Sequence, residues 1–246
     1  MTNEKRTAVL IILVALFIIS VDIINAALPE GPGSLTSIEN RTKGTVSALV
    51  KNDSGGNIHV MNLNATLKNT KWKAYLGNVS GRLTLDDASG NTVYDWNIAN
   101  SLTGEIYSTR SATTPSWTQI ACANLTHIER ENTKLSHTNS KDNITATFDG
   151  TDNSAFYVGT VSINANSCRT TNIYVNDTKD LTDDFEEVIL YDGTNTTNGK
   201  LVYATLIENK RFGYDNSKYD FQMIVPDNGS SGFTGRIGYY FYVELV

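Results

Sequence analysis

The sequence predicts an all-β protein, an antiparallel β-sandwich of about thirteen strands that follows an apolar N-terminal signal or anchor helix. Val, Ile, Tyr, Thr and Phe occur in short runs broken by Gly, Asn and Asp, which is the composition of strands joined by turns. Leu and Glu do not gather into long helix-forming windows. The body of about 220 residues is large enough to bury a core without a metal ion.

The first element is an export signal. Residues 1–6, MTNEKR, form a basic-ended start, and residues 7–21 carry no charge. Small residues, Pro and Gly follow, so we expect a cleaved signal peptide with a cut after Ala26. Two alternatives stay open: an uncleaved membrane anchor, or a pilin-type signal cut after Arg6. We assign residues 1–27 to this signal peptide or membrane anchor and expect membrane contact only through residues 7–28. All three alternatives place residues 30–246 outside the cytoplasm, either secreted or on the cell surface.

Residues 28–56 are expected to form a linker and a first strand. LPEGPGS at 28–34 is a Pro/Gly hinge, GTVSALV at 44–50 is the strand, and KNDSGGN at 51–57 is a turn. The β-sandwich domain is expected over residues 57–246. Its strands are predicted near 57–67, 71–79, 81–86, 92–98, 104–109, 117–121, 143–149, 155–163, 171–175, 186–192, 200–208, 218–225 and 236–245.

Period-two alternation is clearest in the last strand. Ile237, Tyr239 and Phe241 would point one way, and Tyr240 and Tyr242 the other. A run this apolar predicts a central position in the sheet. The single helix that the sequence allows is a short one at 123–132, with Asn124 as its cap.

Two cysteines, Cys122 and Cys168, are an even number in a chain predicted to be exported, which favours a disulfide over two buried thiols. The Asn-x-Ser/Thr triplet gives nine candidate glycosylation sites, against about five expected by chance. They are Asn40, Asn52, Asn64, Asn78, Asn124, Asn143, Asn176, Asn195 and Asn228.

Reactive chemistry has little support. The net charge of −6 with scattered Lys and Arg excludes nucleic acid as an expected partner. Asp86 and Asp87 fit an Asx-type hairpin turn better than a calcium loop, because no bidentate Glu follows at the required spacing. The acidic run at 180–192 reads as a solvated loop face. We expect no catalytic residues, no metal and no cofactor, and therefore no enzyme.

Three tryptophans, Trp72, Trp96 and Trp117, lie in or beside predicted strands. Tryptophan in a sandwich is usually core, but a row of aromatic rings on an exposed sheet face can stack on sugars. Both interpretations stay open for these three residues.

Several segments resemble a group of exported, β-rich cell-surface proteins from small-genome archaea. The resemblance runs from about residue 57 to the end. It rests on WKAYLGNVSGRLTLDDASGNTVYDW, GEIYST, Trp117 before Cys122, FEEVILYDG, and the terminal YDFQMIVPDNG and YYFYVEL. It implies a cell-envelope setting and no particular reaction.

The sequence therefore predicts a non-enzymatic structural or adhesive protein of the archaeal cell envelope. One alternative is a carbohydrate-binding module. Another is a pilus-like filament subunit that donates the strand at 44–50 to the next subunit. The expected partners are envelope proteins, surface glycans or further copies of the chain.

Overall fold

The computed structural model describes residues 27–96, 103–179, 184–193 and 201–246. These residues are rich in strands, and their sheets are antiparallel. Residues 1–26 of the predicted leader, residues 180–183 of the acidic run, and Asn195 lie outside the described residues. Within the described ranges, no helix has the length and apolar content needed to cross a bilayer.

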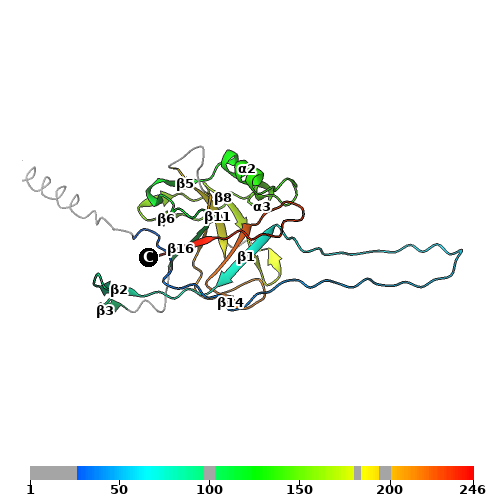
Figure 1. Ribbon diagram of the computed structural model, residues 1–246, viewed down its shortest axis with the longest axis horizontal. Coiled ribbons are helices and arrows are strands. Elements are labelled where there is room, and N and C mark those ends of the chain that lie inside the picture. Colours follow the sequence, from blue (N-terminus) through cyan, green and yellow to red (C-terminus); the bar gives the residue numbers. More distant parts are fainter. Residues whose placement is uncertain (1–26, 97–102, 180–183, 194–200) are drawn as a thin grey trace, which may run out of the picture.

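A six-stranded antiparallel sheet forms the centre of the fold (Figure 1). Its order is β16 (Tyr240–Leu245), β4 (Gly104–Thr109), β12 (Leu201–Leu206), β11 (Glu186–Asp192) and β5 (Ile120–Cys122), and β8 (Arg169–Asn172) also pairs with β11. Every residue of β11 is buried, including Glu186, Glu187 and Asp192. The interpretation of the acidic run as a solvated loop face is therefore wrong for residues 186–192, because this strand is covered on both faces of the sheet.

The two faces of this sheet carry separate apolar clusters. On one face, Tyr107, Val188 and Val202 pack with Trp117 and with the hairpin β6 (Phe156–Val158) and β7 (Val161–Ile163). On the other, Ile189 and Tyr203 pack under α2 (Leu125–Lys134), α3 (Ile144–Thr147), and the strand pair β1 (Trp72–Gly77) and β15 (Phe221–Pro226).

Smaller two-stranded sheets lie around this core. They pair β2 (Leu83–Asp86) with β3 (Thr92–Trp96), β9 (Tyr174–Val175) with β10 (Thr178–Lys179), and β13 (Arg211–Phe212) with β14 (Lys218–Tyr219).

The predicted short helix is confirmed as α2, and its start is set by Asn124. The Asn124 side chain accepts a hydrogen bond from the backbone N–H of His127. The strand predicted at 143–149 is wrong, because the same type of cap operates there. The Asn143 side chain accepts from the N–H of Ala146 and begins α3 in spite of the β-branched residues that follow. The strand predicted at 117–121 is a 3₁₀ turn, Trp117–Gln119, that leads into β5.

The last strand begins at Tyr240, so Ile237 and Tyr239 of the predicted alternation lie before it. Within β16, Phe241 and Tyr242 face opposite sides as predicted, but the predicted central position is wrong. β16 is the end strand of the sheet and pairs with β4 alone among the named strands. It is nevertheless covered on both faces, since Phe241 packs in one cluster and Tyr242 against another. A single bridge from Glu30 to Val243 occupies its outer edge.

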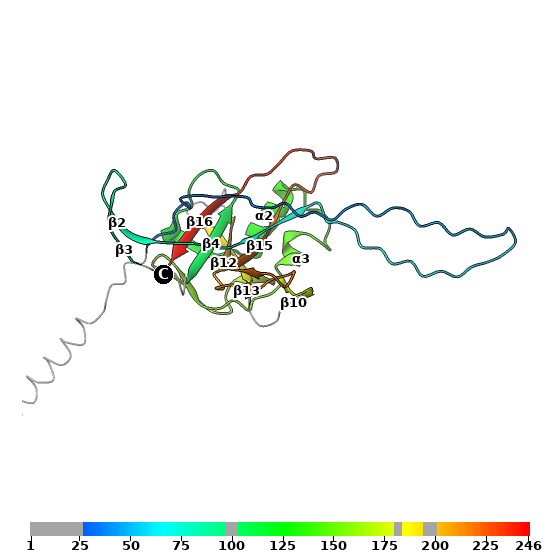
Figure 2. The same cartoon turned by 90° about the horizontal axis from the view of Figure 1, so that it is seen from below.

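The strands predicted at 44–50 and 57–67 are also wrong. Residues 34–70, here called the arm, leave the body as two extended legs that meet near Gly55 and Gly56 (Figures 1 and 2). Within the described chain, no β-bridge joins either leg to another segment. A strand requires a partner for its N–H and C=O groups, and the described chain supplies none along these two legs.

Candidate functional site

The arm is held at its root by ion pairs. Arg41 on the outgoing leg contacts Asp215 and donates a hydrogen bond to the Tyr214 hydroxyl at 3.1 Å. Directly after the returning leg, Lys71 contacts both carboxylate oxygens of Asp142, at 3.1 and 3.2 Å. The root is therefore anchored to the body, while the length between Arg41 and Lys71 extends into solvent (Figure 2).

The free length of the arm carries apolar side chains that nothing in the described chain covers. Val60 is 97% exposed and Leu63 is 88% exposed. Soluble monomers do expose single apolar residues, but a continuous set of this kind marks an interaction surface. The exposed set comprises Val46, Leu49, Val50, Ile58, Val60, Met61, Leu63 and Leu67.

The returning leg has the side-chain period of a strand. Met61, Leu63, Ala65 and Leu67 alternate with Asn62, Asn64 and Thr66. In an extended chain the first set lies along one side and the second along the other. Residues 61–67 are therefore amphipathic at period two, although they have no strand partner in the described chain.

A second exposed element, the β2–β3 hairpin, projects from the body. Its turn is the Asx type predicted from the sequence. The Asp87 carboxylate accepts from the backbone N–H groups of Ser89 and Asn91, both at 2.8 Å, and Gly90 has a φ of +82°. These hydrogen bonds lower the pKa of Asp87, with the Asn91 side chain making the largest contribution.

One face of this hairpin is entirely apolar. The register places Leu83 opposite Trp96 and Leu85 opposite Tyr94, so all four side chains share a face. Leu85 is 55% exposed and Trp96 is 47% exposed, and the Tyr94 and Trp96 rings meet edge to face at 5.0 Å. We call these four residues the hairpin face. Its opposite side carries Thr84 and Asp95, and Asp95 pairs with Arg82.

The arm and the hairpin face lie at opposite ends of the molecule, as both ribbon views show (Figures 1 and 2). Their charges differ in sign. The arm carries four cations and two carboxylates, whereas residues 82–96 carry one cation and three carboxylates. The cations of the arm are Arg41, Lys43, Lys51 and Lys68, and the carboxylates of residues 82–96 are Asp86, Asp87 and Asp95.

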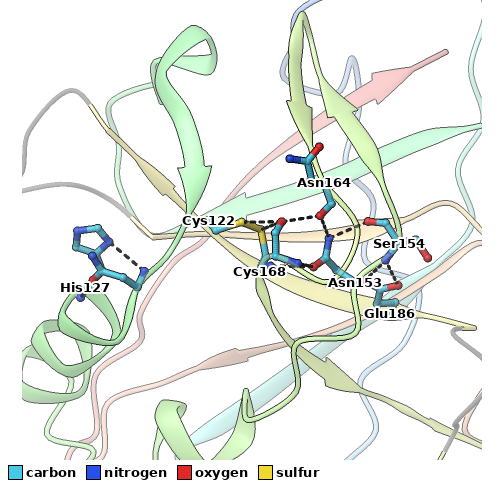
Figure 3. The surroundings of a disulfide bond; sticks show 9 residues. Cys122, His127, Asn153, Ser154, Asn164, Cys168 and Glu186 are labelled. Carbon is cyan, nitrogen blue, oxygen red and sulfur yellow. Dashed lines mark hydrogen bonds between the residues drawn. A yellow bond between two sulfur atoms is a disulfide. The ribbon is translucent and has the colours of Figure 1, made fainter.

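Cys122 and Cys168 are disulfide-bonded, with their Cα atoms 4.9 Å apart (Figure 3). The buried Asn153 side chain organises the loop that presents Cys168. Its amide group donates to the carbonyls of Ser154 and Asn164, and its oxygen accepts from the N–H groups of Ser167 and Cys168. This use of Asn153 follows from the folded loop and has no signal in the sequence.

Two buried carboxyls meet inside the fold, and no pattern in the sequence indicates this pair. Glu105 and Glu244 are directly opposed on β4 and β16. The Tyr107 hydroxyl donates to Glu244 at 2.9 Å, and the backbone N–H of Gly159 donates to its other oxygen at 2.8 Å. Burial and the neighbouring Glu244 raise the pKa of Glu105 to about 8. Burial also raises the pKa of Glu244.

This carboxyl pair does not resemble a hydrolytic site, since each residue is at most 6% exposed and Glu244 is bonded to the protein at both oxygens. A surface depression of about 540 Å³ lies elsewhere, between Ile207 and Lys218, and Glu208 is the one carboxylate among its lining residues. Among the described residues, no group of three or more His, Cys, Asp and Glu is placed to hold a metal ion.

The three candidate tryptophans have three different environments. Trp117 is core, 6% exposed between Tyr107 and Tyr242. Trp72 is half-buried, and its indole N–H donates to the carbonyl of Asp142 at 2.8 Å. Trp96 alone of the three is exposed. The structure therefore does not bring the three into one row.

Most of the candidate glycosylation sites are accessible. Asn143 and Asn228 are half-buried, and Asn195 lies outside the described residues. The exposed ones are Asn40, Asn52, Asn64, Asn78, Asn124 and Asn176.

No family model, curated protein or solved structure matches the chain. The hairpin face is the part of the candidate site that sequence reasoning missed. Period-two alternation in Leu83–Leu85 and Tyr94–Trp96 was available as a signal, but only the register shows that the four side chains share one exposed face.

Proposed function

We propose that this chain is a non-enzymatic structural or adhesive component of the cell envelope, exported to the surface of an archaeal cell. The observation that carries the proposal is the arm, a long exposed segment with apolar side chains and unpaired backbone groups. Such a segment is costly in water unless a partner covers it, which favours a protein whose role is to bind other surface molecules.

Two features support export. The disulfide between Cys122 and Cys168 is of the kind that persists in oxidising compartments. The sequence of residues 1–27 is that of a signal peptide or anchor. The archaeal setting rests on the resemblance of residues 57–246 to surface proteins of small-genome archaea.

We further propose that the body is the β-sandwich of about thirteen strands expected from the sequence, with the central sheet as one layer and the β1–β15 pair contributing to the other. The support is that Trp72, Tyr75 and Val225 pack against Ile189 and Tyr203 of the central sheet. Helices α2 and α3 cover the remainder of the same face.

Surface labelling tests the proposed function. Intact source cells are treated with a membrane-impermeant amine reagent, and the labelled sites are mapped by mass spectrometry. We expect Lys43 and Lys51 on the arm to be labelled in intact cells, since the arm projects from the body. Labelling that appears only after the cells are lysed would contradict the proposal.

Carbohydrate binding is the second candidate, and the pairing of Tyr94 with Trp96 favours it. Both rings are exposed on one hairpin face, where a sugar ring could stack. A glycan array probed with the full chain and with Trp96→Ala tests this candidate. We expect a signal that the substitution abolishes, and the absence of any signal from the unaltered chain rules the candidate out.

A further inference from the structure

We propose that the arm of one molecule adds to the β2–β3 hairpin of a second copy, with residues 61–67 of the returning leg as a third strand. The inference rests on the proposed structural or adhesive function and identifies the partner as a second copy of the chain. It also identifies which segment is donated and which element accepts it. The donated segment is the returning leg, and the acceptor is the hairpin face formed by Leu83, Leu85, Tyr94 and Trp96.

Apolar side chains on the two elements have the same period. Met61, Leu63, Ala65 and Leu67 lie along one side of the returning leg. When this segment pairs beside β2 or β3, these side chains lie on the same side of the sheet as the hairpin face. The apolar surface then extends from two strands to three. Asn62 and Asn64 then lie on the polar side with Thr84 and Asp95, and a glycan on Asn64 does not obstruct the pairing.

Backbone groups are also complementary. Residues 57–69 form no strand or bridge in the described chain, so they offer free N–H and C=O groups. In a two-stranded sheet, each strand of the hairpin has one unpaired edge. Two-stranded ribbons are marginally stable in water, and a third strand with an apolar face stabilises them. Addition of an extended segment to such an edge is a recurrent mode of recognition.

Electrostatics favour a second copy over a neutral partner. The arm has an excess of two positive charges and residues 82–96 an excess of two negative charges. The entire region 69–246 is acidic, with twenty-one Asp and Glu against fourteen Lys and Arg. Attraction between an arm and the hairpin of another molecule therefore adds to the apolar contact, and it weakens as salt increases.

The placement of the two elements determines the kind of assembly. Because the arm and the hairpin lie at opposite ends of the molecule, the arm in this structure points away from its own hairpin and toward the place of a neighbouring molecule (Figures 1 and 2). The contact is then between unlike surfaces, and each molecule keeps one free arm and one free hairpin. Contacts of this kind form open chains unless the rotation between neighbours closes a ring.

Photo-crosslinking tests the contact directly. Full-length chain with benzoylphenylalanine at position 63 is mixed with ¹⁵N-labelled unaltered chain, irradiated and digested. We expect heavy peptides from residues 82–96 to be joined to light peptides from the arm. The control carries the same group at position 62, on the opposite side of the leg, and is expected to crosslink these peptides less. Crosslinks confined to one chain, or joined to another region of the second copy, overturn the proposal.

Paired substitutions test the energetics. Sedimentation velocity of the full chain measures self-association for Leu63→Lys against Asn62→Lys on the arm, and for Leu85→Lys against Thr84→Lys on the hairpin. Each pair adds the same charge on opposite sides of one strand. We expect the two Leu variants to raise the dissociation constant by about tenfold or more, and the two controls to change it much less.

Each outcome has a definite meaning. A chain that stays monomeric at every concentration overturns the assembly, as does equal weakening by the Leu variants and their controls. Capture of the monomer by glycans or by lipid vesicles through the arm or the hairpin would assign a different occupant and also overturn it. Surface labelling of intact cells is independent of these measurements, so the proposed function can stand when the assembly fails.

Discussion

Glu105 and Glu244 lie directly opposite each other on β4 and β16, with both carboxyls buried on the same face of the central sheet. Two charged carboxylates cannot occupy such a site without a large cost. The folded protein lowers this cost by keeping a proton on Glu105, whose pKa is raised to about 8 by burial and by Glu244. One oxygen of Glu105 has no hydrogen-bond partner in the described structure.

This arrangement predicts a protein that loses stability as the pH rises. The unfolded chain releases the Glu105 proton near pH 4.5, whereas the folded chain retains it to about pH 8. The contribution is therefore fully present below pH 4.5 and falls by about 1.4 kcal/mol per pH unit until about pH 8. Urea unfolding at a series of pH values measures the slope.

Substitution of Glu105 separates this effect from other titrations. Glu105→Gln keeps the shape of the side chain but cannot ionise, so we expect it to make the slope between pH 5 and 8 smaller. Part of the slope should remain, because burial also raises the pKa values of Glu244 and Glu187. Glu129→Gln, at an exposed position on α2, is the control and should leave the slope unchanged. An unaltered slope in Glu105→Gln would show that the pair does not hold the proton.

The disulfide is expected to contribute substantially to stability. It links positions 46 residues apart, and closing such a loop in the unfolded chain corresponds to about 4 kcal/mol in the chain-entropy model. We expect the double variant Cys122→Ala, Cys168→Ala to lose about this amount, measured by urea unfolding under oxidising conditions. A reductant should bring the unaltered protein to a similar stability and leave the double variant as it was.

Breaking the ion pair between Arg110 and Glu131 should cost more stability than breaking the pair between Arg82 and Asp95. Glu131 is largely buried on α2 and receives two contacts from the Arg110 guanidinium, one of them at 2.8 Å. Arg110→Gln leaves that carboxylate without its partner, and we expect a loss of about 3 kcal/mol in the free energy of unfolding. Arg82→Gln breaks the exposed pair with Asp95 and should cost less than about 1 kcal/mol.

A third variant checks the cause of that loss. Glu131→Gln added to Arg110→Gln removes the unpaired charge, so the double variant should recover part of the stability lost by Arg110→Gln alone. Equal losses in the single and the double variant would indicate that packing of the Arg110 side chain, and not its charge, accounts for the effect.

Local signals in the sequence predicted local structure well. The turn at Asp87 and the helix after Asn124 depend on side chains that bond to backbone only a few residues away, and both were predicted. The alternation of the last strand was also predicted, but its place in the sheet was not, because the residue types in a strand do not specify its neighbours.

Pairing across long separations was beyond sequence reasoning. Glu105 meets Glu244, far along the chain, only because β16 pairs with β4 in one register. The hairpin face likewise needs the register of β2 and β3. In the arm, the sequence pattern is present but the strand is not. Met61, Leu63 and Leu67 have the pattern of a strand, while the described chain supplies no partner for it.

The last prediction compares substitution by alanine at Trp117 and at Trp96. The first should mainly lower stability, and the second should mainly weaken binding. Trp117 is buried among Tyr107 and Tyr242, so Trp117→Ala should lower the free energy of unfolding by about 3–5 kcal/mol. Trp96 is exposed on the hairpin face, and Trp96→Ala should change stability by only about 0.5 kcal/mol.

The same two substitutions should affect association or glycan binding in the reverse order, with the larger effect from Trp96→Ala. Trp96→Ala removes the largest side chain of the hairpin face, so it should weaken self-association by about tenfold if the arm docks there. A folded Trp117→Ala protein, studied below its unfolding temperature, should associate as the unaltered chain does, because Trp117 packs inside the body. A Trp96→Ala chain that is destabilised but associates normally would place Trp96 in the fold and exclude it from the interface.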